Sequence, residues 1–141
     1  MARFPLQEVV SVPRHVRVRR VQSVAEAELV ARLSTPISPE LIDSFPEGPT
    51  SKDRQSQRFT IVIDAIGADG RAGRGVVQGT DTYGTTAVIA VEAVHRLVSG
   101  KAPSGVVAPA QAFEPADFLD TLAAAGVSWS IETFEALPAL P

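Results

Sequence analysis

A polar segment near the middle of the chain brings side chains suited to acid–base chemistry to the expected start of a helix. Residues 78–87 read Gln-Gly-Thr-Asp-Thr-Tyr-Gly-Thr-Thr-Ala; a β-branched pair precedes them, and apolar and small residues follow. The ordinary role of Asp81 here is to cap the helix by accepting a hydrogen bond from the N–H of Tyr83 or Gly84. For Tyr83 the ordinary role is packing with a satisfied hydroxyl. The alternative is catalysis, with Asp81 as acid or base and the Tyr83 hydroxyl as general acid or oxyanion donor.

Three threonines in the same segment indicate an anion site. A helix N-terminus stabilises negative charge, so their hydroxyls could hold the carboxylate or phosphate of a substrate. These residues are Thr82, Thr85 and Thr86. Together with Arg58, at the start of a strand pattern, they are the expected substrate-binding residues.

Asp64 is a carboxylate in the middle of an expected strand. If it is buried, an arginine such as Arg58 or Arg74 must pair with it. A buried carboxylate in a pocket has a shifted pKa and could then serve acid–base catalysis. A surface charge on an edge strand is the ordinary alternative. The candidate catalytic residues are therefore Asp64, Tyr83 and Asp81.

Composition argues against other chemistries. The 141 residues include no cysteine and only two histidines, far apart in sequence, so we expect no disulfide, thiol nucleophile or metal site. His95 lies about three helical turns, roughly 18 Å, beyond Tyr83, so the two cannot act together on one helix. Its ordinary role is that of a partly exposed residue near a helix C-terminus.

Net charge and hydropathy argue against two kinds of partner, nucleic acid and membranes. Four arginines could contact nucleic acid, but no aromatic residues alternate with them and the net charge is −3, so we expect no nucleic-acid partner. These are Arg14, Arg17, Arg19 and Arg20. No apolar run approaches the ~20 residues that span a bilayer, and the N-terminus lacks the apolar core of a signal peptide. We expect a cytoplasmic protein without membrane contact, from a bacterium with a GC-rich genome.

The elements that position these residues follow from periodicity and turn chemistry. Alternation predicts strands, apolar spacing of three and four predicts helices, and Gly, Pro and Ser mark the boundaries. The expected strands are 15–22, 58–66, 72–78 and 127–132; the expected helices are 24–33, 39–44, 83–99 and 115–125; a long polar loop covers 46–57, a hairpin turn 67–70, an extended segment 105–113 and a frayed tail 137–141. This order predicts a single α+β domain over 1–141, with a mostly antiparallel open sheet and helices packed on one face.

Three segments resemble the C-terminal part of saccharopine-dehydrogenase-like oxidoreductases. Residues 79–87 are similar to that family's Gly-x-Asp-x-Tyr-Gly-x-Thr-Ala segment, and residues 105–113 to its Gly-Val-x-x-Pro-Ala segment. Residues 114–127 are similar to the helix and strand that close those proteins. The resemblance covers about Phe59 to Thr133. It implies the half of the fold that binds substrate and forms the dimer, while a separate Rossmann half binds the dinucleotide.

The sequence contains no strand-linked Gly-x-Gly-x-x-Gly, because Gly70, Gly73 and Gly75 lie in or beside a hairpin rather than in a βαβ unit. We therefore expect no cofactor and no independent NAD(P)-dependent dehydrogenase activity. The leading hypothesis is a free-standing or excised substrate-binding and dimerisation domain. It would bind a small molecule, form a homodimer and work with a separate Rossmann-domain partner. The alternatives are a cofactor-independent cyclase or isomerase of a bacterial biosynthetic pathway, and a non-catalytic accessory protein.

Overall fold

The chain forms two compact units of helices and antiparallel strands. The computed structural model describes residues 1–100 and 102–135. The N-terminal unit comprises residues 1–48 and 104–112, and the sheet unit comprises the described residues of 49–103 and 113–141. The predicted α+β class, with antiparallel pairing throughout, is confirmed.

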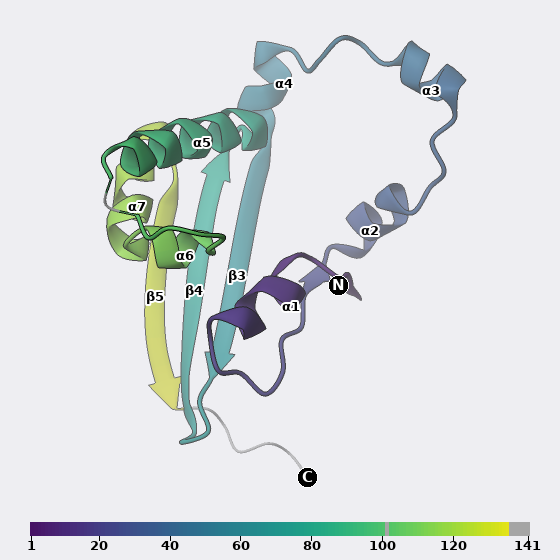
Figure 1. The fold of residues 1–141 in the computed structure, drawn as a ribbon. Coiled ribbons are helices and arrows are strands. Elements are labelled where there is room, and N and C mark those ends of the chain that lie inside the picture. Colours follow the sequence, from purple (N-terminus) through teal and green to yellow (C-terminus); the bar gives the residue numbers. More distant parts are fainter. Residues whose placement is uncertain (101, 136–141) are drawn as a thin grey trace. The chain divides into compact units, whose positions relative to one another are not determined.

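A three-stranded antiparallel sheet forms the centre of the sheet unit. Its strands are β3 (Arg58–Ile66), β4 (Arg71–Thr80) and β5 (Ser128–Glu135), in the order β3-β4-β5 (Figure 1). The first two form the expected hairpin. Its turn is closed by Gly70 at φ 81° and by the Asp69 carboxylate, which accepts a hydrogen bond from the Arg71 N–H.

Two helices, α5 and α7, pack against one end of this sheet. The long helix α5 (Thr82–Val98) follows β4 directly and crosses the end of the sheet where β4 ends (Figure 1). The shorter α7 (Pro115–Leu122) contacts both α5 and β5, and it continues into the turn η2 (Ala123–Ala125). Trp129 on β5 donates its indole N–H to the Asp120 carboxylate of α7 at 2.9 Å, so α7 packs on the face of the sheet that carries Trp129.

The core of the sheet unit is small. Leu122, Val127 and Ala72 are the hydrophobic residues that are buried in the described part of the chain. The rings of Phe113 and Phe118 stack with centroids 5.2 Å apart, beside the start of α7. Much apolar surface of this unit is therefore still exposed to solvent.

The register of the strands divides the sheet into two faces of different character. Residues opposite each other in an antiparallel pair point to the same side. One face, here named the apolar face, carries Phe59, Ile61, Ile63, Ala65, Gly73, Gly75, Val77, Trp129, Ile131 and Thr133. The other, the charged face, carries the cross-strand row Asp64, Arg74 and Glu132.

The N-terminal unit consists of short elements around a two-stranded ribbon. The ribbon pairs β1 (Ala2–Arg3) with β2 (Val24–Ala25). The remaining elements are α1 (Glu8–Ser11), the turn η1 (Val12–Arg14), α2 (Ala27–Leu33), α3 (Pro39–Ser44) and α6 (Pro109–Ala112). The Ser38 hydroxyl caps α3 by accepting from the Leu41 N–H, as its sequence predicts.

Four segments differ from the sequence prediction. Residues 15–22 form no strand, because alternation alone stabilises none without a neighbouring strand to pair with. The helix expected from Val24 begins at Ala27, since the Ser23 hydroxyl bonds the Phe4 carbonyl and the Leu6 N–H instead of capping it. The loop 46–57 contains α4 (Ser51–Ser56), and the extended segment 105–113 contains α6.

Candidate functional site

The polar segment between β4 and α5 forms a tight strand-to-helix junction. Asp81 lies in the left-handed region at φ 48°, and its carboxylate accepts a hydrogen bond from the Gly84 N–H at 3.0 Å. The predicted N-cap is confirmed. A Cβ at position 84 would lie 2.3 Å from Asp81 Oδ2, so a larger residue there would displace the capping carboxylate. The cap therefore depends on two residues three positions apart.

Two of the three threonine hydroxyls expected to bind an anion at this junction are engaged in local hydrogen bonds. The buried Thr85 donates to the Thr80 carbonyl at 2.9 Å, and Thr86 donates to the Thr82 carbonyl at 2.8 Å. The Asp81 carboxylate already occupies the positive end of the helix, so a second anion there would face like charge. This arrangement does not favour the anion site expected from the sequence.

Two arginines connect this junction to α4. Arg54 on α4 places Nη1 3.8 Å from Asp81 Oδ2. Arg58 donates to the carbonyls of Gln55 and Gln57 at 2.7 and 2.9 Å, and thereby satisfies acceptors at the C-terminal end of α4. In the structure Arg58, which was expected to contact substrate, thus stabilises the C-terminal end of helix α4.

Tyr83 points away from the sheet unit's core. It is 71% exposed, so the expected packing of this side chain is not found. It lies on the outward side of α5, whereas the Asp81 carboxylate is turned back to Gly84. Its phenol is free to contact another molecule.

Asp64 is an exposed partner in an ion pair. Its two carboxylate oxygens accept from Arg74 Nε at 2.7 Å and Nη2 at 2.8 Å, and both side chains are about half exposed. Hydrogen bonding to Arg74 holds the pKa of Asp64 below its ordinary value, while partial desolvation opposes that shift. A carboxylate with a lowered pKa is ionised at neutral pH and is a weak base. This geometry therefore favours a surface charge over a catalytic role for Asp64.

The candidate residues do not form one site. Arg58 stands opposite Thr80, beside the junction, but Asp64 is six residues further along β3. At about 3.3 Å per residue, this separation is roughly 20 Å. Asp64 therefore cannot share a substrate with Asp81 or Tyr83 within one copy of the sheet unit.

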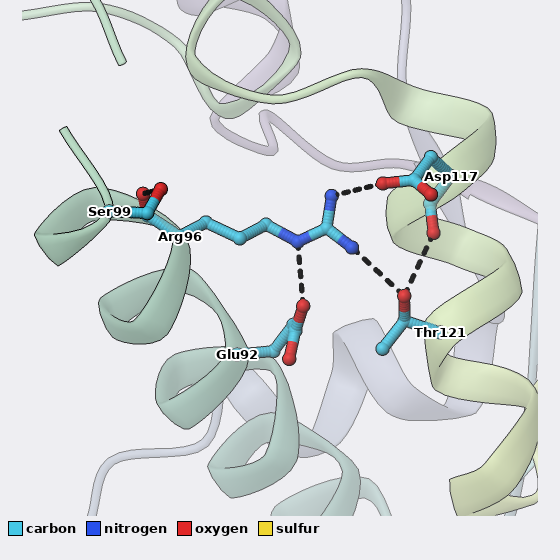
Figure 2. A network of polar contacts seen from close by, with 5 residues as sticks. All are labelled: Glu92, Arg96, Ser99, Asp117 and Thr121. Carbon is cyan, nitrogen blue, oxygen red and sulfur yellow. Dashed lines mark hydrogen bonds and ion pairs between the residues drawn. The ribbon is translucent and has the colours of Figure 1, made fainter. Parts of the chain in front are cut away.

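A polar network that the sequence did not reveal joins α5 to α7. Figure 2 shows the Arg96 side chain reaching from α5 to α7. It donates to Glu92 on its own helix at 2.6 Å, and to Asp117 and Thr121 on α7 at 2.5 and 2.9 Å. Hydrogen bonds to Glu92 and then Asp117 raise the pKa of Arg96. The guanidinium also lies 4.9 Å over the Phe118 ring, so this network, named the Arg96 clamp, is a structural link.

One hollow of the sheet unit lies away from the β4–α5 junction. It has a volume of about 630 Å³, opens widely to solvent, and lies around the β3–β4 turn. Its lining includes Ile66, Arg71 and Phe134. The β4–α5 junction, with Asp81 and Tyr83, is at the other end of the strands, and Asp64 is not among the lining residues although its neighbour Ala65 is.

Other kinds of site find no support in the described residues. Across residues 1–100 and 102–135, no group of three or more His, Asp or Glu side chains could hold a metal ion. Over the same range, no helix has the length and apolar character that crossing a membrane requires. No protein-family model matches the chain, and neither a curated protein nor a solved structure does.

Proposed function

We propose that this chain is a substrate-binding and dimerisation domain similar to the C-terminal half of saccharopine-dehydrogenase-like oxidoreductases. In this role it holds a small molecule and a second subunit. The dinucleotide is held by a Rossmann half, either in the same longer chain or in a separate protein. The proposal rests on the three sequence segments and on one structural observation, the uncovered part of the apolar face.

The apolar face is covered at one end only. Phe59 and Trp129, near the helices, are partly buried, but Ile61, Ile63 and Ile131 are 53%, 62% and 67% exposed. Contiguous exposed apolar surface of this kind marks a place where a ligand or another protein binds. This surface is the best candidate for the substrate wall or subunit contact.

Two glycines in the central strand leave the middle of this face without side chains. On the apolar face Gly75 lies between Ile63 and Ile131, and Gly73 lies between Ala65 and Thr133. Neither has the positive φ that would require glycine, and a Cβ at Gly75 would meet no atom within 4 Å. Glycine weakens a strand, so its use where the fold itself has room for a side chain is typical of close approach by a ligand or another backbone.

The accessory-protein alternative fits the geometry better than the cyclase or isomerase alternative. Asp64 is ion-paired on the charged face, and Asp81 caps a helix. The hollow near the turn is wide and open rather than closed around a substrate. An acid–base enzyme needs its groups within hydrogen-bond reach of one reacting atom.

Three measurements on the purified chain test the proposal. Calorimetric titration with NADPH should give no binding. Micromolar affinity would overturn the proposal that a separate Rossmann half holds the dinucleotide. Light scattering should give twice the mass of one chain, and a strict monomer at all concentrations would remove the dimerisation role.

The third measurement uses the fluorescent probe 8-anilinonaphthalene-1-sulfonate, which binds exposed apolar surface. Ile63→Asp should lower the bound fluorescence. Val62→Asp is the matched control, because Val62 is the neighbouring residue on the charged face and is 51% exposed. An equal effect of both variants would show that the apolar face is not the binding surface.

A further inference from the structure

Helix α5 presents an apolar stripe on the side opposite to its own unit. At 100° per residue, Glu92 and Arg96 lie on one side of the helix with the buried Thr85. The opposite side is formed by Tyr83, Ala87, Ala90, Val91, Val94, Leu97 and Val98. These seven residues are named the α5 stripe, and none of them is charged.

The α5 stripe is exposed along its whole length. Tyr83 and Val98, at its two ends, are 71% and 78% exposed, and Val91 and Val94 in its middle are 57% and 55% exposed. Helices in water usually turn their apolar side to the core and their charges outward. In α5 the charged Glu92 and Arg96 lie on the inner side, because the Arg96 clamp joins them to α7, and an apolar side is left outside.

We infer that the α5 stripe binds the α5 stripe of a second copy of this chain, with the two helices antiparallel. The inference rests on the dimerisation role proposed above and identifies its surface. A two-fold axis between Ala90 and Val91 would make residue i of one helix contact residue 181 − i of the other.

Side-chain sizes along the stripe match this pairing. Ala87 of one copy would lie beside Val94 of the other, and Ala90 beside Val91. Small residues would thus face larger ones, which allows close approach without gaps. In a parallel pair with the two helices in register, Ala87 and Ala90 of one copy would instead face the same alanines of the other copy. A different protein as partner would impose no relation between the two halves of the stripe.

Charge favours the same arrangement. The positive N-terminal end of each helix would lie beside the negative C-terminal end of its partner. The α5 stripe itself brings no like charges together. At 17 residues the helix is about 25 Å long.

Disulfide cross-linking tests the pairing, because the chain has no native cysteine. In the antiparallel pair the two copies of residue 90 are offset by one residue, about 1.5 Å along the helix. That is within disulfide reach at a helix separation of 8–10 Å. The two copies of residue 98 are 15 residues apart, roughly 22 Å. Ala90→Cys should therefore form a cross-linked dimer under mild oxidation, and Val98→Cys should not, although Val98 is the more exposed.

A mixing experiment makes the test stricter. Ala87→Cys and Val94→Cys should each cross-link poorly alone, since their own copies would be about 10 Å apart along the helix. Mixed together, they should form the heterodisulfide at least several times faster than either forms a homodisulfide.

The outcomes separate this inference from the proposed function. A light-scattering dimer that cross-links best at Val98, or equally at all positions, overturns the α5 pairing and leaves dimerisation through another surface. A monomer that does not cross-link at Ala90 overturns both.

Discussion

The α5 pairing predicts a measurable loss of dimer affinity when Val94 is shortened to alanine. Each methyl or methylene group that leaves water contributes ~0.8 kcal/mol. Val94 is 55% exposed, so this fraction of two methyl groups is available for burial on association. The loss is roughly 0.9 kcal/mol per copy and ~1.8 kcal/mol per dimer. Because 1.4 kcal/mol corresponds to tenfold, the dimer dissociation constant should rise about 20-fold.

Sedimentation equilibrium over a dilution series measures this constant directly. The matched control is Val62→Ala, because Val62 is the same residue type, is 51% exposed and lies on the charged face of the sheet. It should leave the dissociation constant unchanged. Circular dichroism of both variants confirms that the helix content is retained. If the two valines gave the same shift, or Val94→Ala gave none, the α5 pairing would be refuted.

A reciprocal exchange sharpens this prediction. In the antiparallel pair Ala87 faces Val94 of the other copy, so Ala87→Val alone should crowd the contact and weaken the dimer. The double variant Ala87→Val with Val94→Ala again places a small residue opposite a large one. It should recover most of the lost affinity. Simple addition of the two single effects would contradict direct contact between these positions.

Three further predictions concern the sheet unit itself. Asp81→Ala should destabilise it by about 2 kcal/mol, through the lost cap and a left-handed alanine, whereas Asp81→Asn should stay within about 0.5 kcal/mol in urea unfolding; equal losses would argue against the cap. Arg96→Ala should lower the free energy of unfolding, since it removes the hydrogen bonds to Glu92, Asp117 and Thr121, while Arg32→Ala, whose side chain is 74% exposed, should change it by less than ~0.5 kcal/mol. Since the Arg74 contact lowers the pKa of Asp64, the pair stabilises the fold above the ordinary carboxyl pKa of 3.8 and is lost as the pH falls through the lowered value. The melting difference between wild type and Arg74→Gln should therefore shrink in acid, and a difference that grew in acid would contradict this assignment.

Elements with strong local signals were predictable from the sequence. Strand β3 has an apolar alternation, its turn has glycine and aspartate in the right places, and α5 has helical spacing after a capping aspartate. Helix α4 was missed because it has no apolar side. Its signal is the capping box in which Thr50 and Asp53 bond each other's backbone N–H groups. A polar segment can thus be helical when its first turn is well capped.

The candidate site was less predictable because it depends on tertiary contacts. Alternation in β3 places Asp64 on a face, but it does not say whether that face is covered. The Arg96–Glu92 pair has the i, i+4 spacing of neighbours on one helix, a signal that the sequence analysis did not use, whereas Asp117 is reached only once α7 lies beside α5. The same docking decides which side of α5 is exposed. No periodicity in α5 alone contains that information.

The contact between Trp129 and Asp120 gives the protein a built-in optical reporter. Trp129 is the single tryptophan of the chain, and its indole joins α7 to the edge strand β5. Opening of this joint would move the indole into water and shift its fluorescence to longer wavelength, without any label. Comparing that signal with the far-ultraviolet dichroism of the whole chain would separate local release of α7 from global unfolding. Because Trp129 lies on the apolar face, binding at that face could be followed by the same fluorescence.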